Sequence, residues 1–226
     1  MPSCPNPHAR FPVSQLSRRP MFRTIALVAC LAAPVGAQQI EYSFPAQTFT
    51  MDPAHSTLVF RVNHLGFSHY TAGFDTLDGM LVLDPDAPES SVLSVTIPLA
   101  SLDLATPPAG FRDMLLGPDW FDAAAYPQIT YVSTAITLTG AKTATVDGDL
   151  TLHGFTHPVT LQVTYNGGWG KQPFEPQARA GFSATGTLNR SDFGMVNGLP
   201  PEGTDFGVGD QVSFVIETEW MGEPFR

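Results

Sequence analysis

Cysteine is scarce in this 226-residue chain, and both cysteines, Cys4 and Cys30, lie within the first 37 residues. The rest of the chain therefore offers no disulfide, no thiolate nucleophile and no cysteine-based metal site. Charge is scarce as well, because only 14% of the residues are charged, against about 25% in an average soluble domain. Aromatic and β-branched residues are plentiful, which argues against disorder and for a packed domain.

Acidic residues are absent from the first 37 residues, which have the composition of an export signal. The apolar run TIALVACLAAP at 24–34 is too short to span a bilayer, and VGA at 35–37 resembles a signal-peptidase site. We expect cleavage near Ala37, a periplasmic or secreted mature protein and no transmembrane segment.

Three alternatives stay open for this leader. The stretch SRRPMFR at 17–23 is close to a twin-arginine export pattern. Met21 could be the true start of an ordinary Sec signal. The stretch LVAC at 27–30 has the form of a lipoprotein box in which Cys30 would be acylated.

Basic residues are few beyond the leader. The leader holds four of the 11 basic residues and none of the 21 acidic ones, which leaves seven basic residues against 21 acidic and a net charge near −14. Such a field repels nucleic acid and bare anionic membrane surface, so neither is an expected partner.

Helical periodicity is almost absent from residues 51–221, which alternate between apolar and polar residues between turn signals. The expected strands are 56–65, 71–84, 91–102, 128–138, 143–153, 157–165, 177–189 and 211–220. Eight strands at this spacing predict an all-β, eight-stranded antiparallel barrel or sandwich. Residues 38–50 form an approach segment and 222–226 a tail.

One apolar face per strand favours a closed sheet around an apolar interior. In the first strand Leu58, Phe60, Val62 and His64 share one face. The single helical candidate is PPAGFRDMLLG at 107–117, which would place one apolar stripe over the barrel mouth.

Five ordered motifs resemble those of the YceI-like family. They are DPAHS at 52–56 with FRVNHLGFS at 60–68, RDML at 112–115 with DWFD at 119–122 and YP at 126–127, GDLTLHGFT at 148–156, NRSDFG at 189–194, and GDQV at 209–212. Trp120 stands where the family usually has phenylalanine. The resemblance implies a lipocalin-like barrel, periplasmic or secreted, that holds an isoprenoid-chain lipid, and several members of the family are dimers.

Histidine spacing argues against a metal site. His55 and His64 are nine residues apart, roughly 30 Å in an extended strand, and they face opposite sides. The pairs His64 with His69 and His153 with His157 flank turns without a cysteine or a well-placed acid. No G-x-S-x-G motif occurs. We expect no metal, no cofactor and no catalytic residue. His55 is expected to bond within a turn, whereas His64 is either a core histidine or a contact to a ligand's polar head.

The hypothesis from the sequence is a non-enzymatic exported protein that carries a polyprenyl phosphate or an isoprenoid quinone. The alternative is a secreted stress-response or interaction protein with a solidly packed barrel. Arg112 and Arg190 would bond a ligand oxygen or else pair with Asp113 or Asp122 and with Asp192, respectively. The expected ligand-binding residues are Phe60, Val62, His64, Phe67, Phe111, Arg112, Met114, Leu115, Trp120, Phe121, Phe182, Arg190 and Phe193.

Overall fold

The computed structural model describes residues 44–224, so the expected export signal and its cleavage site lie outside the described residues. The strands are β1 (Gln47–Met51), β2 (Thr57–His64), β3 (Ser68–Phe74), β4 (Asp78–Leu83), β5 (Val92–Pro98), β6 (Leu102–Leu104), β7 (Gln128–Leu138), β8 (Thr143–Leu152), β9 (Phe155–Trp169), β10 (Gln177–Asn189) and β11 (Val208–Pro224). The other elements are α1 (Phe111–Leu116) and the 3-10 turns η1 (Pro88–Ser90), η2 (Leu99–Ser101) and η3 (Arg190–Phe193). None of the helices found in 44–224 has the length and apolar character needed to cross a membrane.

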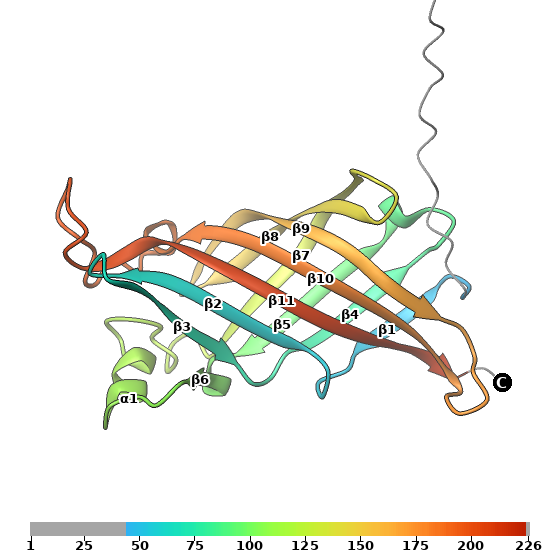
Figure 1. The fold of residues 1–226 in the computed structure, drawn as a ribbon, viewed down its shortest axis with the longest axis horizontal. Helices are drawn as coiled ribbons and strands as arrows, with labels where there is room; N and C mark the ends of the chain where they lie inside the picture. Colours follow the sequence, from blue (N-terminus) through green and yellow to red (C-terminus); the bar gives the residue numbers. More distant parts are fainter. Residues whose placement is uncertain (1–43, 225–226) are drawn as a thin grey trace, which may run out of the picture. The chain divides into compact units, whose positions relative to one another are not determined.

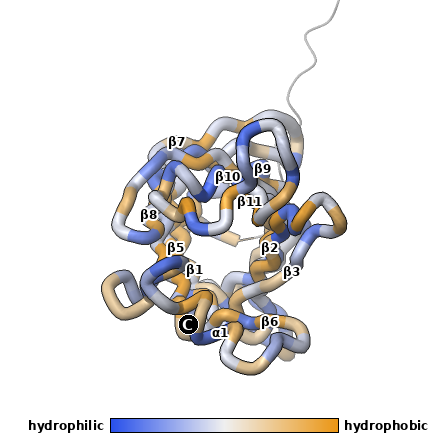
Figure 2. Tube along the Cα trace, turned by 90° about the vertical axis from the view of Figure 1, so that its left-hand side faces the viewer, coloured by the Kyte–Doolittle hydropathy of each residue, from blue (hydrophilic) through white to orange (hydrophobic). Residues whose placement is uncertain are grey.

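Eight of these strands form a closed antiparallel ring. They are hydrogen-bonded in the order β1, β4, β5, β7, β8, β9, β10, β11, and β11 pairs back onto β1. Figure 1 shows the strands from the side, and Figure 2 looks along the barrel, where the chain runs around a ring. The ring confirms the eight-stranded antiparallel barrel predicted from the sequence.

The barrel forks toward the end that carries α1. β11 is 17 residues long, and it pairs with β1 through residues 220–222 and with β2 through residues 208–217. β3 and β6 follow β2 on this branch, while β4 and β5 stay in the ring. The expected strands 71–84 and 91–102 are therefore each divided in two. The segment 105–127, which contains α1, connects β6 to β7 at the forked end (Figure 1).

β1 is absent from the strands expected from the sequence, which placed residues 47–50 in the approach segment and began the barrel at Met51. Phe49 is fully buried and Met51 is buried at 6% exposure, so β1 supplies core residues as well as ring closure. The alternation in QTFTM carried this signal, but five residues with two apolar positions gave too little of it.

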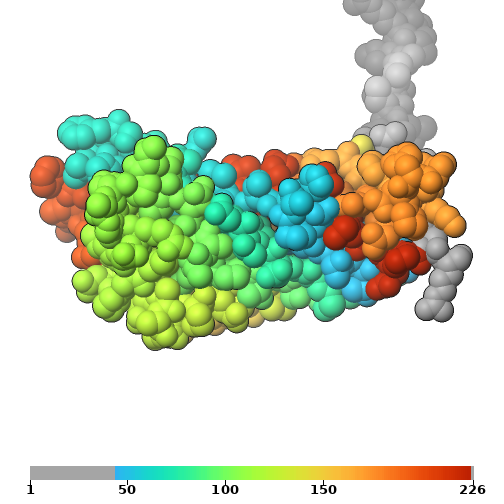
Figure 3. Space-filling view, turned by 90° about the horizontal axis from the view of Figure 1, so that it is seen from below, coloured from blue at the N-terminus to red at the C-terminus, as the bar shows by residue number. Residues whose placement is uncertain are grey.

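α1 is shorter than the expected helix over residues 107–117. It begins at Phe111 because Gly110, with φ of 76°, holds the left-handed conformation and breaks the helical path before that point. It ends before Gly117, as predicted. In the space-filling view of Figure 3, the green segment that contains α1 covers the barrel at the forked end.

Gly148 on β8 lies against the ring of Tyr131 on β7 inside the barrel. A Cβ at Gly148 would overlap that ring and lie 2.7 Å from the carbonyl oxygen of Val132. Because forcing a methyl group into space that other atoms already occupy costs about 1–3 kcal/mol, we expect Gly148→Ala to lower the free energy of unfolding by that amount in urea denaturation. Gly181→Ala is the control, since its Cβ would meet no atom closer than 3.8 Å. Equal losses in the two variants would contradict this account.

Candidate functional site

A cavity of about 580 Å³ lies inside the barrel. Every strand of the closed ring contributes lining side chains, as do β2, β3 and the segment that contains α1. The lining is dominated by aliphatic and aromatic side chains, among them Leu58, Leu161, Ile216 and Trp220. Ligand pockets in proteins commonly measure about 300–1,000 Å³ and have such a lining. The interior therefore has the size and the character of a site for an apolar molecule.

Some of the inward side chains around this cavity are only half-buried. Phe60, Val95, Phe182 and Phe214 point inward and line the cavity, yet each keeps an intermediate exposure. Others in the same lining, such as Leu161 and Trp220, are buried. An eight-stranded barrel is just wide enough either to fill itself or to hold one ligand. This barrel is hollow, which contradicts the solid interior required by the alternative hypothesis.

The expected inner face of the first strand is confirmed. Leu58, Phe60, Val62 and His64 of β2 all line the cavity. Nine of the expected ligand-binding residues are brought together in the lining: Phe60, Val62, His64, Phe111, Leu115, Trp120, Phe121, Phe182 and Arg190. Whether they contact a ligand stays a prediction, while their common position around one cavity is a property of the structure.

Four of the expected ligand-binding residues lie outside the lining. Phe67 sits in the β2–β3 turn with 86% of its surface exposed, and Met114 of α1 is 47% exposed. Phe193 is the opposite case, because it is 1% exposed and packs in the core against the ring of His157, 5.3 Å away between centroids. Arg112, the fourth, bonds to backbone. A period-two pattern identifies strand faces but cannot orient side chains in turns and short helices.

Backbone carbonyl groups bind the guanidinium of Arg190. The predicted ion pair with Asp192 is therefore wrong. Its side chain is buried, and its guanidinium donates hydrogen bonds to the carbonyl oxygens of Gly209, Met195, Asn197 and Val208 at 2.6–2.8 Å. Burial lowers the pKa of this guanidinium below its ordinary value. Arg190 thus ties η3 and the connection that follows it to the start of β11.

The ring of Trp120 completes the surroundings of Arg190. The guanidinium carbon lies 5.6 Å from the ring centroid, which is within the range of cation–π contact. Trp120 also lines the cavity. The cation of Arg190 is therefore shared between carbonyl oxygens and an aromatic face, and it is largely satisfied before any ligand binds.

Arg112 also bonds to backbone, so its expected pairing with Asp113 or Asp122 is wrong. Its side chain donates to the carbonyl oxygen of Leu102 at 3.0 Å and to that of Ala100 at 2.5 Å. Both arginines of the motif blocks satisfy carbonyl groups in connections and at the first residues of strands. Arg112 thereby fastens α1 to η2 and β6.

Polar groups in the cavity wall are few, and most are bonded. The hydroxyl of Tyr131 donates toward the carbonyl oxygens of Val146 and Val159, and burial raises its pKa. In the described part of the chain, the hydroxyls of Tyr70 and Ser91 are buried without a hydrogen-bond partner. His64 and Lys142, both exposed, are other lining residues whose side chains can bond a polar group of a ligand.

Several lining residues were missed by sequence reasoning, although the signal was present. Tyr131, Leu161, Phe214 and Ile216 stand at alternating inward positions of strands whose bounds were predicted correctly or nearly so. The period-two pattern that oriented the first strand would have identified them. Tyr70 was harder to identify, because the expected strand 71–84 began after it.

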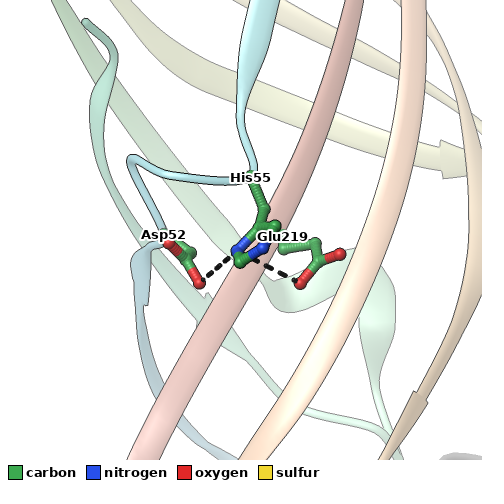
Figure 4. A group of neighbouring side chains, drawn as sticks. All are labelled: Asp52, His55 and Glu219. Carbon is green, nitrogen blue, oxygen red and sulfur yellow. Dashed lines mark hydrogen bonds and ion pairs between the residues drawn. The ribbon is translucent and has the colours of Figure 1, made fainter.

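Asp52, His55 and Glu219 form a charged cluster where β1 passes into β2 (Figure 4). The Asp52 carboxylate bonds Nδ1 of His55 at 3.0 Å, and the guanidinium of Arg179 lies 2.5 Å from the same carboxylate. The main-chain N–H of Ala54 donates to Asp52 as well. This network confirms that His55 bonds within a turn, as predicted.

Opposing effects set the pKa of Asp52. Burial raises this pKa. The hydrogen bonds from His55, Arg179 and the N–H of Ala54 lower it by a larger amount, so that the pKa is about 2. The pKa of His55 is raised, first by its hydrogen bond to Asp52 and then by the charges of Asp52 and Glu219. Arg179 reaches both carboxylates, with 3.8 Å to Glu219, so the cluster already holds a cation.

The other histidines have different surroundings. His69 pairs in register with Asn63, and its side chain therefore faces outward, whereas His64 faces the cavity. His153 and His157 both pack on Phe193, the first through a 3.0 Å hydrogen bond of its Nδ1 with the carbonyl oxygen. Among the described residues, neither pair belongs to a group of three or more side chains that could hold a metal ion.

A closed antiparallel barrel with an apolar hollow and a short covering helix defines a lipocalin-like class of fold. Residues 49–220 match the YceI-like domain, so the chain belongs to the YceI-like family. A UPF0312 protein of Pseudomonas putida (strain W619) is 39% identical over 174 residues, which cover 77% of this chain and 86% of that protein. A UPF0312 protein of Pseudomonas savastanoi pv. phaseolicola is 43% identical over 141 residues, or 62% and 71% of the two chains.

Solved structures share the fold. The crystal structure of BcnA from Burkholderia cenocepacia has a TM-score of 0.64 and 27% identity, and the match covers 75% of this chain and 98% of that one. A polyisoprenoid binding domain from Saccharophagus degradans, implicated in plant cell wall breakdown, has a TM-score of 0.53 and 14% identity over 79% of this chain and 99% of that one. At that identity the second match supports the fold alone.

Proposed function

We propose that this protein is a non-enzymatic binding protein that takes the apolar chain of an isoprenoid lipid into its barrel. The observation that carries the proposal is the cavity of about 580 Å³ with its almost continuous apolar lining. Each methylene transferred from water into such a cavity contributes about 0.8 kcal/mol. Several isoprene units therefore supply micromolar or tighter binding after the cost of ordering the chain.

Support for the isoprenoid class comes from the family. A solved domain of the same fold is described as polyisoprenoid binding, and the motifs of this chain resemble those of that family. The head group is either a phosphate or a quinone in this proposal. Arg190 already donates to four carbonyl oxygens, so a phosphate would sit at a cavity end, beside exposed His64 or Lys142.

The proposal is tested with a substitution that fills the cavity from the middle of one wall. Ala184 on β10 lines the cavity between Val163 and Ile216, its register partners. We expect Ala184→Trp to occupy the hollow and to lower the recovery of bound lipid by tenfold or more. The measurement is mass spectrometry of organic extracts after incubation of the protein with vesicles that contain ubiquinone-8 or decaprenyl phosphate.

Thr185→Trp is the matched control, because Thr185 is the next residue on β10 and faces outward. It should recover as much lipid as the original protein. If the original protein recovered neither probe, the proposed function would be wrong. If both tryptophan variants recovered lipid equally, the ligand would bind elsewhere. The two probes together decide between a phosphate and a quinone head.

A further inference from the structure

Two phenylalanines stand almost fully exposed on neighbouring loops at the forked end of the barrel. Phe67 lies in the β2–β3 turn with 86% exposure, and Phe206 lies in the connection before β11 with 77% exposure. The loops touch, since the N–H of Leu65 donates to the carbonyl oxygen of Gly207 at 2.8 Å. A Cβ on Gly66 would lie 3.1 Å from the Cβ of Asp205. We call Phe67 and Phe206 the aromatic tips.

Both loops are held in one shape by their own bonds. Leu65 and Gly66 have φ of 58° and 70°, as in a type I′ turn, and the N–H of Phe67 donates to the carbonyl oxygen of His64. On the second loop the N–H of Phe206 donates to the hydroxyl of Thr204. The aromatic tips are therefore presented by ordered turns.

The aromatic tips stand beside the cavity. His64 and Val208 are register partners and both line the cavity, and they are the last such pair between β2 and β11. Phe67 follows His64 by three residues and Phe206 precedes Val208 by two, so both project past the cavity wall. Figure 1 shows the β2–β3 turn and the connection before β11 together at this end.

The size of this exposed surface favours one kind of partner. Two phenylalanine side chains offer roughly 300–400 Å², whereas a stable protein interface needs about 800 Å² from each partner. Aromatic side chains on projecting turns suit the interface of a lipid bilayer, where a few of them insert. The cargo proposed above is itself insoluble in water and resides in membranes.

We propose that the aromatic tips insert into a lipid bilayer and place the cavity mouth on the membrane surface, from which the isoprenoid chain enters. The identity of the cargo in this proposal rests on the proposed function, whereas the membrane attachment rests on the exposed aromatic tips alone. Glu202 and Asp205 lie on the second loop, and the chain is acidic as a whole. Attachment is therefore apolar, and it is opposed by anionic lipid.

Flotation with phosphatidylcholine vesicles that contain no isoprenoid tests membrane attachment by the aromatic tips without any contribution from cargo binding. We expect the double variant Phe67→Ser with Phe206→Ser to lower the vesicle-bound fraction by about tenfold or more. Phe174→Ser is the matched control, because Phe174 is 81% exposed in the β9–β10 connection at the opposite end. It should bind vesicles as the original protein does.

Vesicles with phosphatidylglycerol add an electrostatic check. The original protein should bind them more weakly at low salt and recover as salt rises, opposite to a protein held by basic residues. Equal effects of the Phe174 and double variants, or no effect of the double variant, would overturn the proposal and would favour a protein partner.

A second measurement separates this inference from the proposed function. With ubiquinone-8 added to the vesicles, the double variant should take up the probe at least tenfold more slowly than the original protein but reach the same final content. Loss of the final content instead would overturn the role of the aromatic tips in delivery. Failure of the original protein to take up any probe would contradict the proposed function, while flotation would still report on the surface.

Discussion

Replacing Arg190 with alanine is expected to lower the free energy of unfolding by about 3–5 kcal/mol. The side chain is 4% exposed and donates to four backbone carbonyl oxygens. Its removal leaves these acceptors buried without donors, and each such group costs about 1–3 kcal/mol before relaxation and water entry reduce the total. Chemical denaturation at neutral pH measures the loss.

Arg190→Lys should rescue little of this stability, because a lysine ammonium is a point donor and cannot span carbonyls that a planar guanidinium reaches. Arg112→Ala is the comparison at a half-buried arginine with two carbonyl bonds, and about 1–2 kcal/mol is expected there. A loss below about 1 kcal/mol in Arg190→Ala, or full rescue by lysine, would show that the carbonyls find other donors.

Acidification is expected to remove about 2 kcal/mol of stability through Asp52 alone. The pKa of this carboxyl is about 2 in the folded protein and about 3.9 in an unfolded chain. Because the folded value is the lower one, the contribution is present above pH 4 and is lost as the pH falls from about 4 to 2. Unfolding free energies between pH 2 and pH 7 measure it.

Asp52→Asn should lack this part of the pH dependence and be less stable at pH 7, since Arg179 and His55 lose their charged partner. His55 acts in the opposite sense. Its raised pKa contributes stability below the unfolded value, and this contribution is lost as the pH rises through the folded value. His55→Gln should flatten the curve above about pH 6, and it should also reduce the loss on acidification, because the charge of His55 no longer lowers the pKa of Asp52. Identical curves for Asp52→Asn and the original protein would refute the assignment.

The sequence predicted the strands well because their period-two patterns are long. β7 and β10 coincide with their expected bounds, and the inner row of β2 lies on the cavity as expected. The fork could not be predicted. A local apolar–polar pattern looks the same for one long strand as for two consecutive strands that pair with different neighbours. The expected strand 71–84 contained just such a division.

The candidate site was predicted where it depends on strand faces and not where it depends on tertiary contacts. Arg190 bonds to carbonyls up to 19 residues away, and Arg179 reaches Asp52 across 127 residues. Nearby acids such as Asp192 were more visible in the sequence than these partners. The cavity itself depends on the distance between inward-facing side chains on opposite sides of the barrel. Ring closure sets this distance, and no single segment of the sequence determines it.

The forked sheet has a consequence for where the barrel wall can open. Of the strands described between residues 44 and 224, β6 pairs only with β3, and it shares no hydrogen-bonded ladder with β7. The connection between β6 and β7 contains α1, and there Leu115 and Phe121 line the cavity while Arg112 bonds the carbonyl oxygens of Ala100 and Leu102. Separating β6 from β7 breaks no strand ladder, so it needs less free energy than unfolding of the barrel.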